Sequence, residues 1–422
     1  MTQNQNAKPF IIDKHTVMDA WKRVKANKGS AGIDNVSITD FEGNLKCNLY
    51  KLWNRMSSGS YFPDAVKLVD IPKSSGGTRP LGIPTVEDRV AQMAVVMLIE
   101  PRMEQEFHAD SYGYRPNRSA HDALAKARER CWRYDWVLDM DISKFFDTID
   151  HDLLMKAVER HVHEKWILLY IKRWLKVPYA TQSGERIERN MGVPQGSVIG
   201  PVLANLYLHY AFDKWMSIYY PSIPFERYAD DTICHCRNLE EAQRLETSII
   251  ERFATCKLKL NEAKTRIVYC KDGKRKGEHT EITFDFLGYT FQPRALRNKS
   301  GQVFNGFSPA ISKKAKKRIH EKMRCWNLSR RVQIKLSDIA VGINAEVRGW
   351  INYYGKFYSS SLKSFLQEIN LKLARWAERK YKRFRRNPNK AYKWLVKVAS
   401  ENPRLFYHWQ YGAKPNRLKP FG

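Results

Sequence analysis

The chain has 422 residues, enough for two or three domains, and 43% of them are hydrophobic, which is sufficient for packed cores. The 73 Lys and Arg outnumber the 44 Asp and Glu and give a formal charge of +29, so the surface favours a polyanionic partner. No apolar run of about 18 uncharged residues occurs, and the first residues lack the apolar segment of a signal peptide, so we expect a cytoplasmic protein with no membrane partner.

The first third of the sequence alternates helical patterns with short extended runs. We expect helices at residues 15–26, 86–100 and 119–133, a further helix that ends near residue 57, and strands at 61–71, 79–83 and 136–142. The glycine-rich residues 72–78 connect two of these strands into a β-hairpin that carries Lys73 and Arg79 near its tip. The strand WVLDMDI at 136–142 has acidic residues at alternate positions.

The next part of the chain has the same mixed character. We expect a helix capped by Asp150, helices at 201–215 and 240–256, strands on both sides of the acidic pair at 230–231, and further strands within 257–270 and 284–291. The Gly-, Asn- and Ser-rich residues 297–308 are the best candidate for a domain boundary. From residue 311 onward the pattern is mostly helical, with Lys and Arg runs between apolar positions.

Charge is unevenly distributed along the sequence. From Pro309 to the end there are 28 Lys and Arg against 6 Asp and Glu, a net charge of +22. We therefore expect two parts, in which residues 1–300 hold the chemistry and residues 301–422 hold nucleic acid mainly by charge.

The seven cysteines are scattered and include no CxxC pair, so the sequence predicts neither a disulfide framework nor a zinc finger. Cys234 and Cys236 stand two apart, directly after the acidic pair. We interpret them as side chains packed on one face of a strand, in preference to metal ligands.

The motif YADD at 228–231 places Asp230 and Asp231 side by side in an apolar hairpin. Two carboxylates ~4 Å apart repel by roughly 4 kcal/mol at an effective dielectric constant of 20, which a divalent cation would offset. A solvated Asp-Asp turn also explains the pair on its own. The acidic strand adds a third carboxylate, Asp141 or Asp139, which share one strand face and which spacing alone does not separate. Three carboxylates around two Mg²⁺ ions, with Mn²⁺ as a substitute, match two-metal phosphoryl transfer.

Eight motifs in order make the chain similar to the reverse transcriptases encoded by group II introns, often called maturases. They are KANKGSAGIDNVS from Lys25, IPKSSGGTRPLGIPTVEDRVAQ from Ile71, YGYRPNRSAHDAL from Tyr112, DISKFFDTIDH from Asp141, GVPQGSVIGPVLANLYL from Gly192, YADD from Tyr228, LNEAKT from Leu260 and FLGY from Phe286. One four-residue match is a weak signal, whereas eight in the family order do not arise by accident.

The resemblance implies that Asp141, which directly precedes IxxFFD, is the catalytic aspartate beside Asp230 and Asp231. It also implies that the Ile142 carbonyl is a further metal ligand. Phe146 resembles the residue whose ring excludes ribonucleotides, whereas we interpret the neighbouring Phe145 as a core aromatic.

Other positions are implied by the same matching. The nucleotide-binding set is Lys73, Arg79, Phe146, Gln195 and Lys264, and the primer or template set is Gly196, Gly288 and Arg115. Ordinary interpretations stay open for several of them: an exposed cationic loop for Lys73 and Arg79, a surface position for Lys264 and a tight turn for Gly196.

The sequence departs from the commonest family form in one motif, with PQGSVIGP at 194–201 where many members have PQGGPLSP. This leaves the subgroup and the details of the template loop open. The tail is similar to the thumb and maturase region through VRGWINYYGKF at 347–357 and LFYHWQYG at 405–412. Its aromatics suit RNA stacking as a group, but we interpret Trp350, Tyr353 and Trp376 as core residues. We expect the chain to lack the family's endonuclease domain.

The resemblance therefore implies an α+β right-hand polymerase with fingers and palm, followed by a mainly helical basic thumb. The expected activity is RNA-directed DNA synthesis with two Mg²⁺ ions on an RNA template, from a primer and dNTPs, together with binding of group II intron RNA to assist splicing. Two alternatives remain open: a defence reverse transcriptase that copies a dedicated noncoding RNA, and a splicing factor that binds RNA without polymerising.

Overall fold

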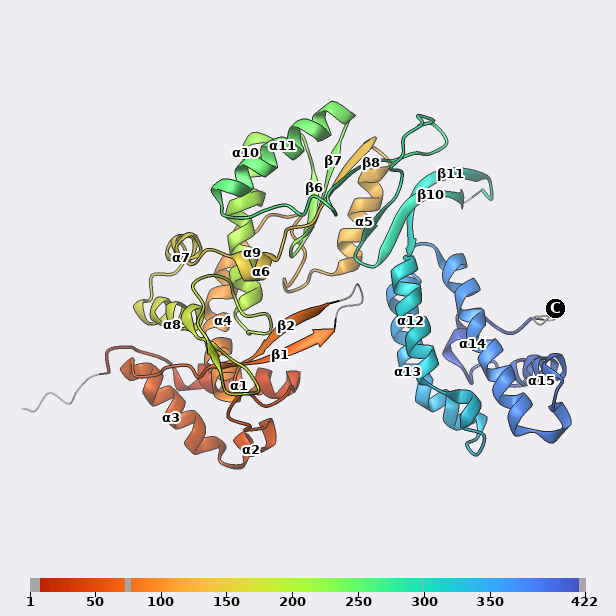
Figure 1. The fold of residues 1–422 in the computed structure, drawn as a ribbon, viewed down its shortest axis with the longest axis horizontal. Coiled ribbons are helices and arrows are strands. Elements are labelled where there is room, and N and C mark those ends of the chain that lie inside the picture. The colour runs from red at the N-terminus through yellow and green to blue at the C-terminus, as the bar shows by residue number, and fades with distance from the viewer. Residues whose placement is uncertain (1–7, 73–76, 299, 417–422) are drawn as a thin grey trace, which may run out of the picture. The chain divides into compact units, whose positions relative to one another are not determined.

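The computed structural model describes residues 8–72, 77–298 and 300–416, and the chain divides into two compact units (Figure 1). Unit 1 comprises Met1–Ala123 and Leu138–Ile267, and unit 2 comprises Leu124–Val137 and Val268–Gly422. None of the helices in the described part of the chain is long and apolar enough to cross a membrane.

Unit 1 begins with helices whose ends follow local capping rules. They are α1 (Lys14–Asn27), α2 (Ile38–Gly43), α3 (Leu45–Ser58) and α4 (Val86–Glu106), and α5 (Ala120–Cys131) starts in the same unit. The side chains of Asp13, Ser37 and Thr85 accept hydrogen bonds from the first turns of α1, α2 and α4. α1 packs along α4 (Figure 1). The four helices predicted in this region are confirmed.

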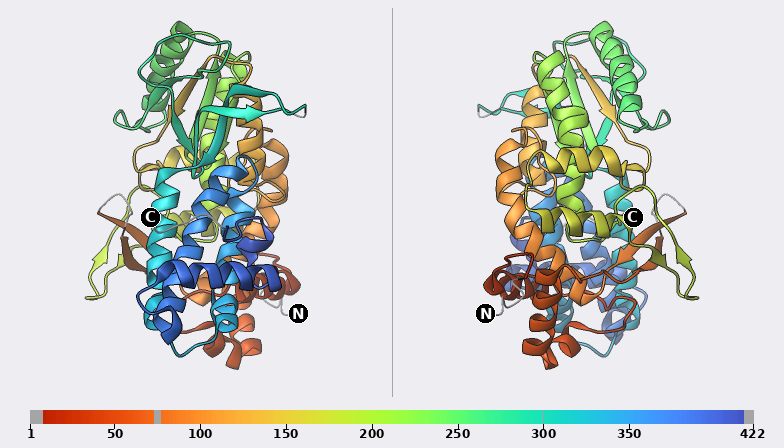
Figure 2. Two further views of the ribbon diagram at one scale, coloured as in Figure 1. Left: turned by 90° about the vertical axis from the view of Figure 1, so that its right-hand side faces the viewer. Right: turned by 90° about the vertical axis from the view of Figure 1, so that its left-hand side faces the viewer.

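A small sheet with the order β2-β1-β4-β5 extends from the predicted basic hairpin. Its strands are β1 (Val66–Pro72), β2 (Thr78–Ile83), β4 (Tyr179–Ala180) and β5 (Arg186–Ile187). β1 and β2 are antiparallel, β4 runs parallel to β1, and the short β4–β5 pair continues the sheet (Figure 2). The hairpin prediction is confirmed, and Lys73 lies outside the described residues.

A second sheet, with the order β6-β7-β3-β8, contains both acidic motifs at its strand ends. The strands are β3 (Trp136–Met140), β6 (Phe225–Tyr228), β7 (Asp231–Cys236) and β8 (Arg266–Tyr269). β6 and β7 form an antiparallel hairpin in which Tyr228 pairs with Asp231. Cys234 and Cys236 are both buried on β7, as predicted for packed side chains.

The remaining helices of unit 1 include the three predicted in this part of the chain. They are α6 (Phe145–Thr148), α7 (His151–Glu159), α8 (Lys165–Lys176), α9 (Gly200–Leu208), α10 (Lys214–Tyr219) and α11 (Leu239–Thr255). Asp150 caps α7 by accepting a hydrogen bond from Leu153 N, as expected. The helix predicted at 201–215 is present, but between α9 and α10 it passes through one π-helical turn, η1 (His209–Asp213). The sequence pattern contains no sign of this turn.

Unit 2 contains a three-stranded sheet with the order β11-β10-β9. Its strands are β9 (Phe284–Phe286), β10 (Tyr289–Arg297) and β11 (Val303–Ile311). β10 and β11 pair from Tyr289 with Ile311 to Arg297 with Val303. The stretch expected to separate two domains therefore contains the end of β10 and the start of β11, which pair at Arg297 and Val303, because its Gly and Asn residues suit a tight turn as well as a linker. The functional division at residue 300 stays a prediction.

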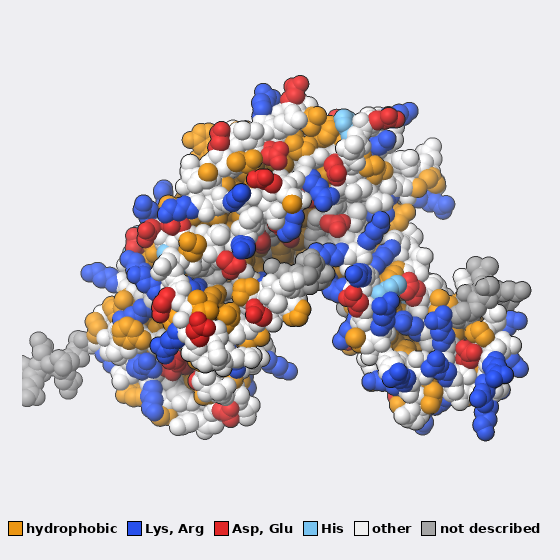
Figure 3. Space-filling view, viewed as in Figure 1, with side chains coloured by type: hydrophobic (Ala, Val, Ile, Leu, Met, Phe, Trp, Pro, Cys, Tyr) orange, Lys and Arg blue, Asp and Glu red, His pale blue; other side chains and the backbone are white. Residues whose placement is uncertain are grey.

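The rest of unit 2 is helical, as predicted. Its helices are α12 (Lys313–Cys325), η2 (Leu328–Arg330), α13 (Leu336–Tyr354), α14 (Ser359–Lys380), η3 (Lys382–Phe384), α15 (Pro388–Glu401) and α16 (Tyr407–Gln410). Trp376 is fully buried, whereas Trp350 and Tyr353 are half-buried and packed against other aromatic rings. Lys and Arg side chains gather on the face of these helices that Figure 3 shows. The predicted fold class, mixed helices and strands followed by a helical basic region, is confirmed.

Candidate active site

Asp141 and Asp230, one from each acidic motif, lie near each other because β7 and β3 are neighbours in one sheet. Asp141 directly follows β3, and Asp230 and Asp231 lie at the turn between β6 and β7, which we call the YADD turn (residues 228–231). Burial, followed by the charge of Asp141, raises the pKa of Asp230, while Arg79 and Lys264 act in the opposite direction. Four of the predicted site residues are therefore close enough to act on one another electrostatically.

Asp141 is bound by the segment that follows α11. Lys264 donates from Nζ to Oδ2 of Asp141 at 2.9 Å, and Asn261 donates to the same oxygen at 3.1 Å. The backbone N–H of Asn261 also donates to the Asp141 carbonyl at 2.8 Å, and Ile142 forms a single β-bridge with Leu260. The motif LNEAKT thus lies along the end of β3. The role of the Ile142 carbonyl as a metal ligand stays a prediction.

Arg79 and Gln195, both predicted to bind the nucleotide, contact each other. The Nε of Arg79 donates to Oε1 of Gln195, and the N–H of Gly82 donates to the Gln195 carbonyl at 2.8 Å. Gly196 has a φ of 114°, and a Cβ there would lie 2.4 Å from the Gly82 carbonyl oxygen, so only glycine fits this loop against β2. The loop that contains Gln195 and Gly196 therefore packs against β2 and contacts the Arg79 side chain.

The two neighbouring phenylalanines on α6 differ in burial as predicted. Phe145 is buried, whereas Phe146 is partly exposed. The Phe146 carbonyl accepts a hydrogen bond from Val193 N at 2.7 Å, which ties α6 to the loop that contains Gln195. The role of the Phe146 ring in excluding ribonucleotides stays a prediction.

Two residues near the carboxylates were missed by the sequence analysis. Asn261 contacts Asp141 directly, as described above. Tyr114 is half exposed, with a left-handed backbone at φ 56°, and burial followed by the charge of Asp230 raises the pKa of its phenol. Asn261 lies in the LNEAKT motif and Tyr114 in the motif that begins at Tyr112. Their place in these family motifs was the sequence signal that could have identified them.

Two predicted primer or template residues have other contacts in the structure. The side chain of Arg115 is 3% exposed and donates to Glu104 and to the carbonyls of His108 and Ser111. These bonds hold the guanidinium inside the protein, and its role at a primer or template stays a prediction. Gly288, in unit 2, has a φ of 79°, and a Cβ there would lie 3.3 Å from the Tyr354 hydroxyl. Its contact with a primer stays a prediction.

The carboxylates fit a divalent cation by their chemistry. Among residues 8–72, 77–298 and 300–416, no three His, Cys, Asp or Glu side chains already form a group that could hold a metal ion. Asp230 nevertheless lies within the field of Asp141, and the Asp141 carboxylate already binds one cation, the Lys264 ammonium. All-oxygen ligands with an excess of negative charge are what Mg²⁺ and Mn²⁺ prefer.

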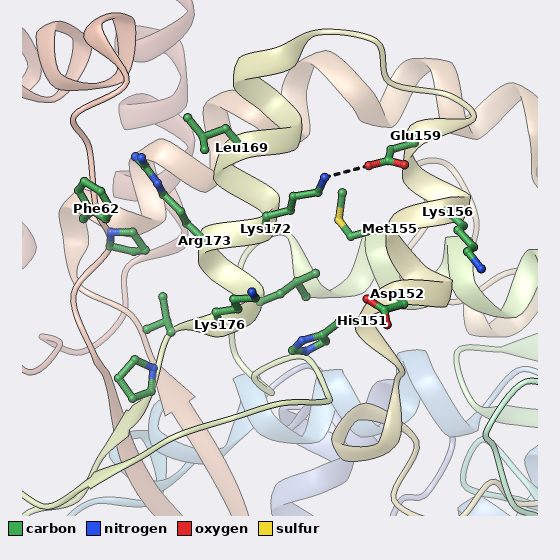
Figure 4. Close-up of a pocket in the computed structure, with 14 residues that line it drawn as sticks. Phe62, His151, Asp152, Met155, Lys156, Glu159, Leu169, Lys172, Arg173 and Lys176 are labelled. Carbon is green, nitrogen blue, oxygen red and sulfur yellow. Dashed lines mark hydrogen bonds and ion pairs between the residues drawn. The ribbon is translucent and has the colours of Figure 1, made fainter.

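A separate cavity of about 740 Å³ lies between α7 and α8 (Figure 4). Phe62, Met155 and Leu169 supply apolar walls, and Lys172 and Glu159 form an ion pair at one side. None of the predicted site residues lines this cavity. The chemistry of the acidic residues is therefore not located in this cavity.

Comparison with known families matches two regions of the chain. The family described as reverse transcriptase (RNA-dependent DNA polymerase) matches residues 71–291. The family described as group II intron, maturase-specific domain, matches residues 316–394. The first match contains the acidic residues, and the second lies in the helical part of unit 2.

Two individual proteins show the same likeness. The protein YkfC of Escherichia coli (strain K12) is 34% identical over 332 residues, which cover 69% of this chain and 83% of that protein. The group II intron-encoded protein LtrA of Lactococcus lactis subsp. cremoris is 32% identical over 198 residues, 47% of this chain and 33% of that protein. A solved telomerase from Candida albicans, in complex with a fragment of telomeric RNA, aligns with a TM-score of 0.46 and 12% identity over 89% of this chain and 68% of that one.

Proposed function

This chain belongs to the reverse transcriptase family, in the form that carries a group II intron maturase domain, and we propose on this premise that Asp141, Asp230 and Asp231 carry its DNA synthesis. The observation that carries the proposal is the position of Asp141 directly after β3 and of Asp230 directly before β7, because these are neighbouring strands of one sheet. The charge of Asp141 adds to burial in raising the pKa of Asp230, and a divalent cation would offset that effect.

The three carboxylates would hold two divalent ions, which supply activation of the primer 3′-hydroxyl and charge neutralisation at the leaving pyrophosphate. Lys264 must release Oδ2 of Asp141 for this to occur. A released ammonium beside the site suits the triphosphate of the incoming dNTP. Lys264 would then move from the Asp141 carboxylate to the triphosphate, so that an anionic group neutralises its charge in both states.

Arg79 and Gln195 would bind the incoming nucleotide together. The Arg79 guanidinium is exposed and keeps its Nη atoms for phosphate oxygens while Nε bonds Gln195. Gln195 is in turn placed by the loop that packs on β2 and by a hydrogen bond to Asp147 at 3.4 Å. This arrangement supports a pre-organised contact with the triphosphate.

Primer extension on poly(rA) with an oligo(dT) primer, dTTP and Mg²⁺ tests the polymerase proposal. We expect product from the wild type and a loss of at least about 100-fold in Asp230→Asn, which keeps the shape and removes the charge. The matched control is Asp19→Asn, an exposed carboxylate on α1 that pairs with Lys22 three positions away. Equal extension by Asp230→Asn and the control would refute the assignment, and no product from a folded wild type that binds RNA would favour the splicing factor.

We further propose that the helical region of unit 2 binds structured group II intron RNA and assists splicing. The maturase match over residues 316–394 and the net charge of +22 from Pro309 onward support this. Filter binding of a transcript of group II intron domains should be at least about tenfold tighter than binding of poly(rU) of equal length. Equal affinity for both RNAs would leave only charge-driven binding and would favour the defence alternative, in which another RNA is the template.

A further inference from the structure

Arg227 is fully buried in unit 1, and its guanidinium joins three segments of the chain. Nε and Nη2 donate to the two carboxylate oxygens of Asp213 at 2.7 and 2.6 Å. Nη1 donates to Oδ1 of Asn205 at 3.0 Å and to the carbonyl of Ala229 at 3.1 Å. Ala229 has a φ of 57°, a left-handed conformation that alanine rarely adopts. The guanidinium therefore holds the strained residue that directly precedes Asp230.

The π-helical turn η1 explains how two partners on one helix reach the same guanidinium. Asn205 lies on α9 and Asp213 ends η1, eight positions later. On a regular α-helix, eight positions leave a rotation of about 80° beyond two full turns, so the two side chains would point in different directions. A π turn takes up about one extra residue and brings them close to the same face. This local distortion thus serves the contact with Arg227.

Residues 110–113 support the same turn from the edge of β6, which is the terminal strand of its sheet. The N–H of Arg227 donates to the Asp110 carbonyl at 2.9 Å, and the N–H of Tyr112 donates to the Arg227 carbonyl at 2.8 Å. Asn205 donates from Nδ2 to the Gly113 carbonyl at 2.7 Å. A Cβ on Gly113 would lie 2.3 Å from Ala229 N, so the backbone of this segment packs directly against the backbone of the YADD turn.

We propose that Arg227, Asp213 and Asn205 are positioning residues that set the backbone of the YADD turn and thereby aim Asp230 and Asp231. Stability alone explains the cluster poorly, because the cost of removing two charges from water offsets most of the attraction within a buried ion pair. The hydrogen bond from Arg227 to the Ala229 carbonyl gives the buried ion pair a second role. It fixes the strained residue that directly precedes Asp230 and Asp231. This inference rests on the polymerase function proposed above and adds residues that touch none of the reacting groups.

Two variants test the proposal. Arg227→Met combined with Asp213→Leu removes both charges at similar side-chain volume, and Asn205→Leu removes only the third partner. Hydrogen exchange across residues 225–236 is measured in protein without primer or nucleotide, and kcat and the KM for dTTP are measured in primer extension. We expect turn exchange at least about tenfold faster and kcat at least about tenfold lower, with KM changed less than about threefold because Arg79 and Gln195 are untouched.

The control is Arg275→Met combined with Asp272→Leu, a largely buried pair of unit 2 that is expected to alter neither turn exchange nor kcat. Wild-type exchange at the turn in either folded test variant overturns the positioning role, and so does equal acceleration in the control. If the double variant does not fold, Asn205→Leu decides alone. A wild type that extends no primer would defeat the polymerase proposal, while the exchange measurement would still test the positioning of the turn.

Discussion

Lys264 Nζ lies 2.9 Å from Oδ2 of Asp141, a contact between residues 123 positions apart. The ammonium thus occupies an oxygen that the proposed function assigns to a divalent ion. The side chains are 62% and 28% exposed, and an exposed ion pair of this kind contributes roughly 0–1 kcal/mol. A metal ion can therefore displace the lysine at small cost.

Lys264→Gln should lower the Mg²⁺ concentration that gives half-maximal primer extension by about two- to fivefold, because a competing cation is removed from Asp141. If Lys264 also binds the triphosphate, the KM for dTTP rises in the same variant. The two constants are measured in separate titrations, with Lys259→Gln as the control because that side chain is exposed and pairs weakly with Glu262. A Mg²⁺ requirement that is unchanged or higher in Lys264→Gln would contradict competition at Asp141.

Gly113→Ala should displace the YADD turn without unfolding the protein. The new Cβ would lie 2.3 Å from Ala229 N and 2.8 Å from the Tyr228 carbonyl carbon, and backbone atoms must move to accept it. A shift of this kind near reacting groups costs about 100-fold in kcat. Gly43→Ala, where a Cβ meets nothing within 4 Å, is the control. Primer extension and melting curves are compared, and a variant as active as Gly43→Ala would show that the turn tolerates the shift.

Phe146 and Phe145 should respond differently to substitution. Phe146→Val replaces the partly exposed ring by a smaller side chain. The ratio of ribonucleotide to deoxynucleotide incorporation should then rise at least about tenfold if the ring contacts the sugar. Phe145→Ala should instead cost about 3–5 kcal/mol of stability, because Phe145 is buried. Incorporation of rUTP and dTTP on poly(rA), together with melting curves, separates the two effects. An unchanged ratio in a folded Phe146→Val would remove Phe146 from nucleotide selection.

Asp88 should make the stability of unit 1 depend on pH. Burial raises its pKa to about 7, although Tyr61 and Trp174 donate hydrogen bonds to the carboxylate. The unfolded carboxyl has its usual pKa near 4. Between about pH 4 and pH 7 the folded state keeps a proton that the unfolded state has released. The resulting stabilisation is complete below about pH 4. It decreases by about 1.4 kcal/mol per pH unit above that value and is lost once the pH has risen through 7.

Asp88→Asn should flatten that dependence, because the amide oxygen can accept both hydrogen bonds without titrating. Urea unfolding followed by tryptophan fluorescence at pH 5 and pH 8 compares the wild type with this variant, and Trp174 reports directly on the site. The exposed Asp70→Asn should behave as the wild type. Identical pH slopes in the wild type and Asp88→Asn would contradict the raised pKa.

The basic segment around η3 should contribute to RNA binding by charge. Lys382, Arg383, Arg385 and Arg386 are exposed around the buried Phe384. Replacing all four with Gln should reduce the slope of log affinity against log salt by up to about 0.7 for each phosphate of single-stranded RNA that the variant no longer binds. Replacing the three arginines with Lys keeps the charge and should keep the slope. A slope unaffected by the Gln replacements would show that these four residues do not bind RNA phosphates.

The sequence by itself determined the local elements and indicated the chemistry that we propose for the carboxylates. Helices such as α1 and α7 follow from apolar periodicity and from side-chain caps at Asp13 and Asp150, because these interactions join residues only a few positions apart. The spacing of YADD and the acidic strand was enough to indicate phosphoryl transfer with divalent ions. The order of the motifs indicated the family, which the comparisons confirm.

Only the tertiary structure decided which of these residues touch. The binding of Lys264 to Asp141 and the burial of Arg115 depend on how distant segments pack. The same holds for the π turn that brings Asp213 to Arg227, and for the pairing of β10 with β11, where composition alone predicts a boundary. Local pattern cannot specify such contacts, because the desolvation and hydrogen bonding that fix a buried charge are contributed by partners far away in the sequence.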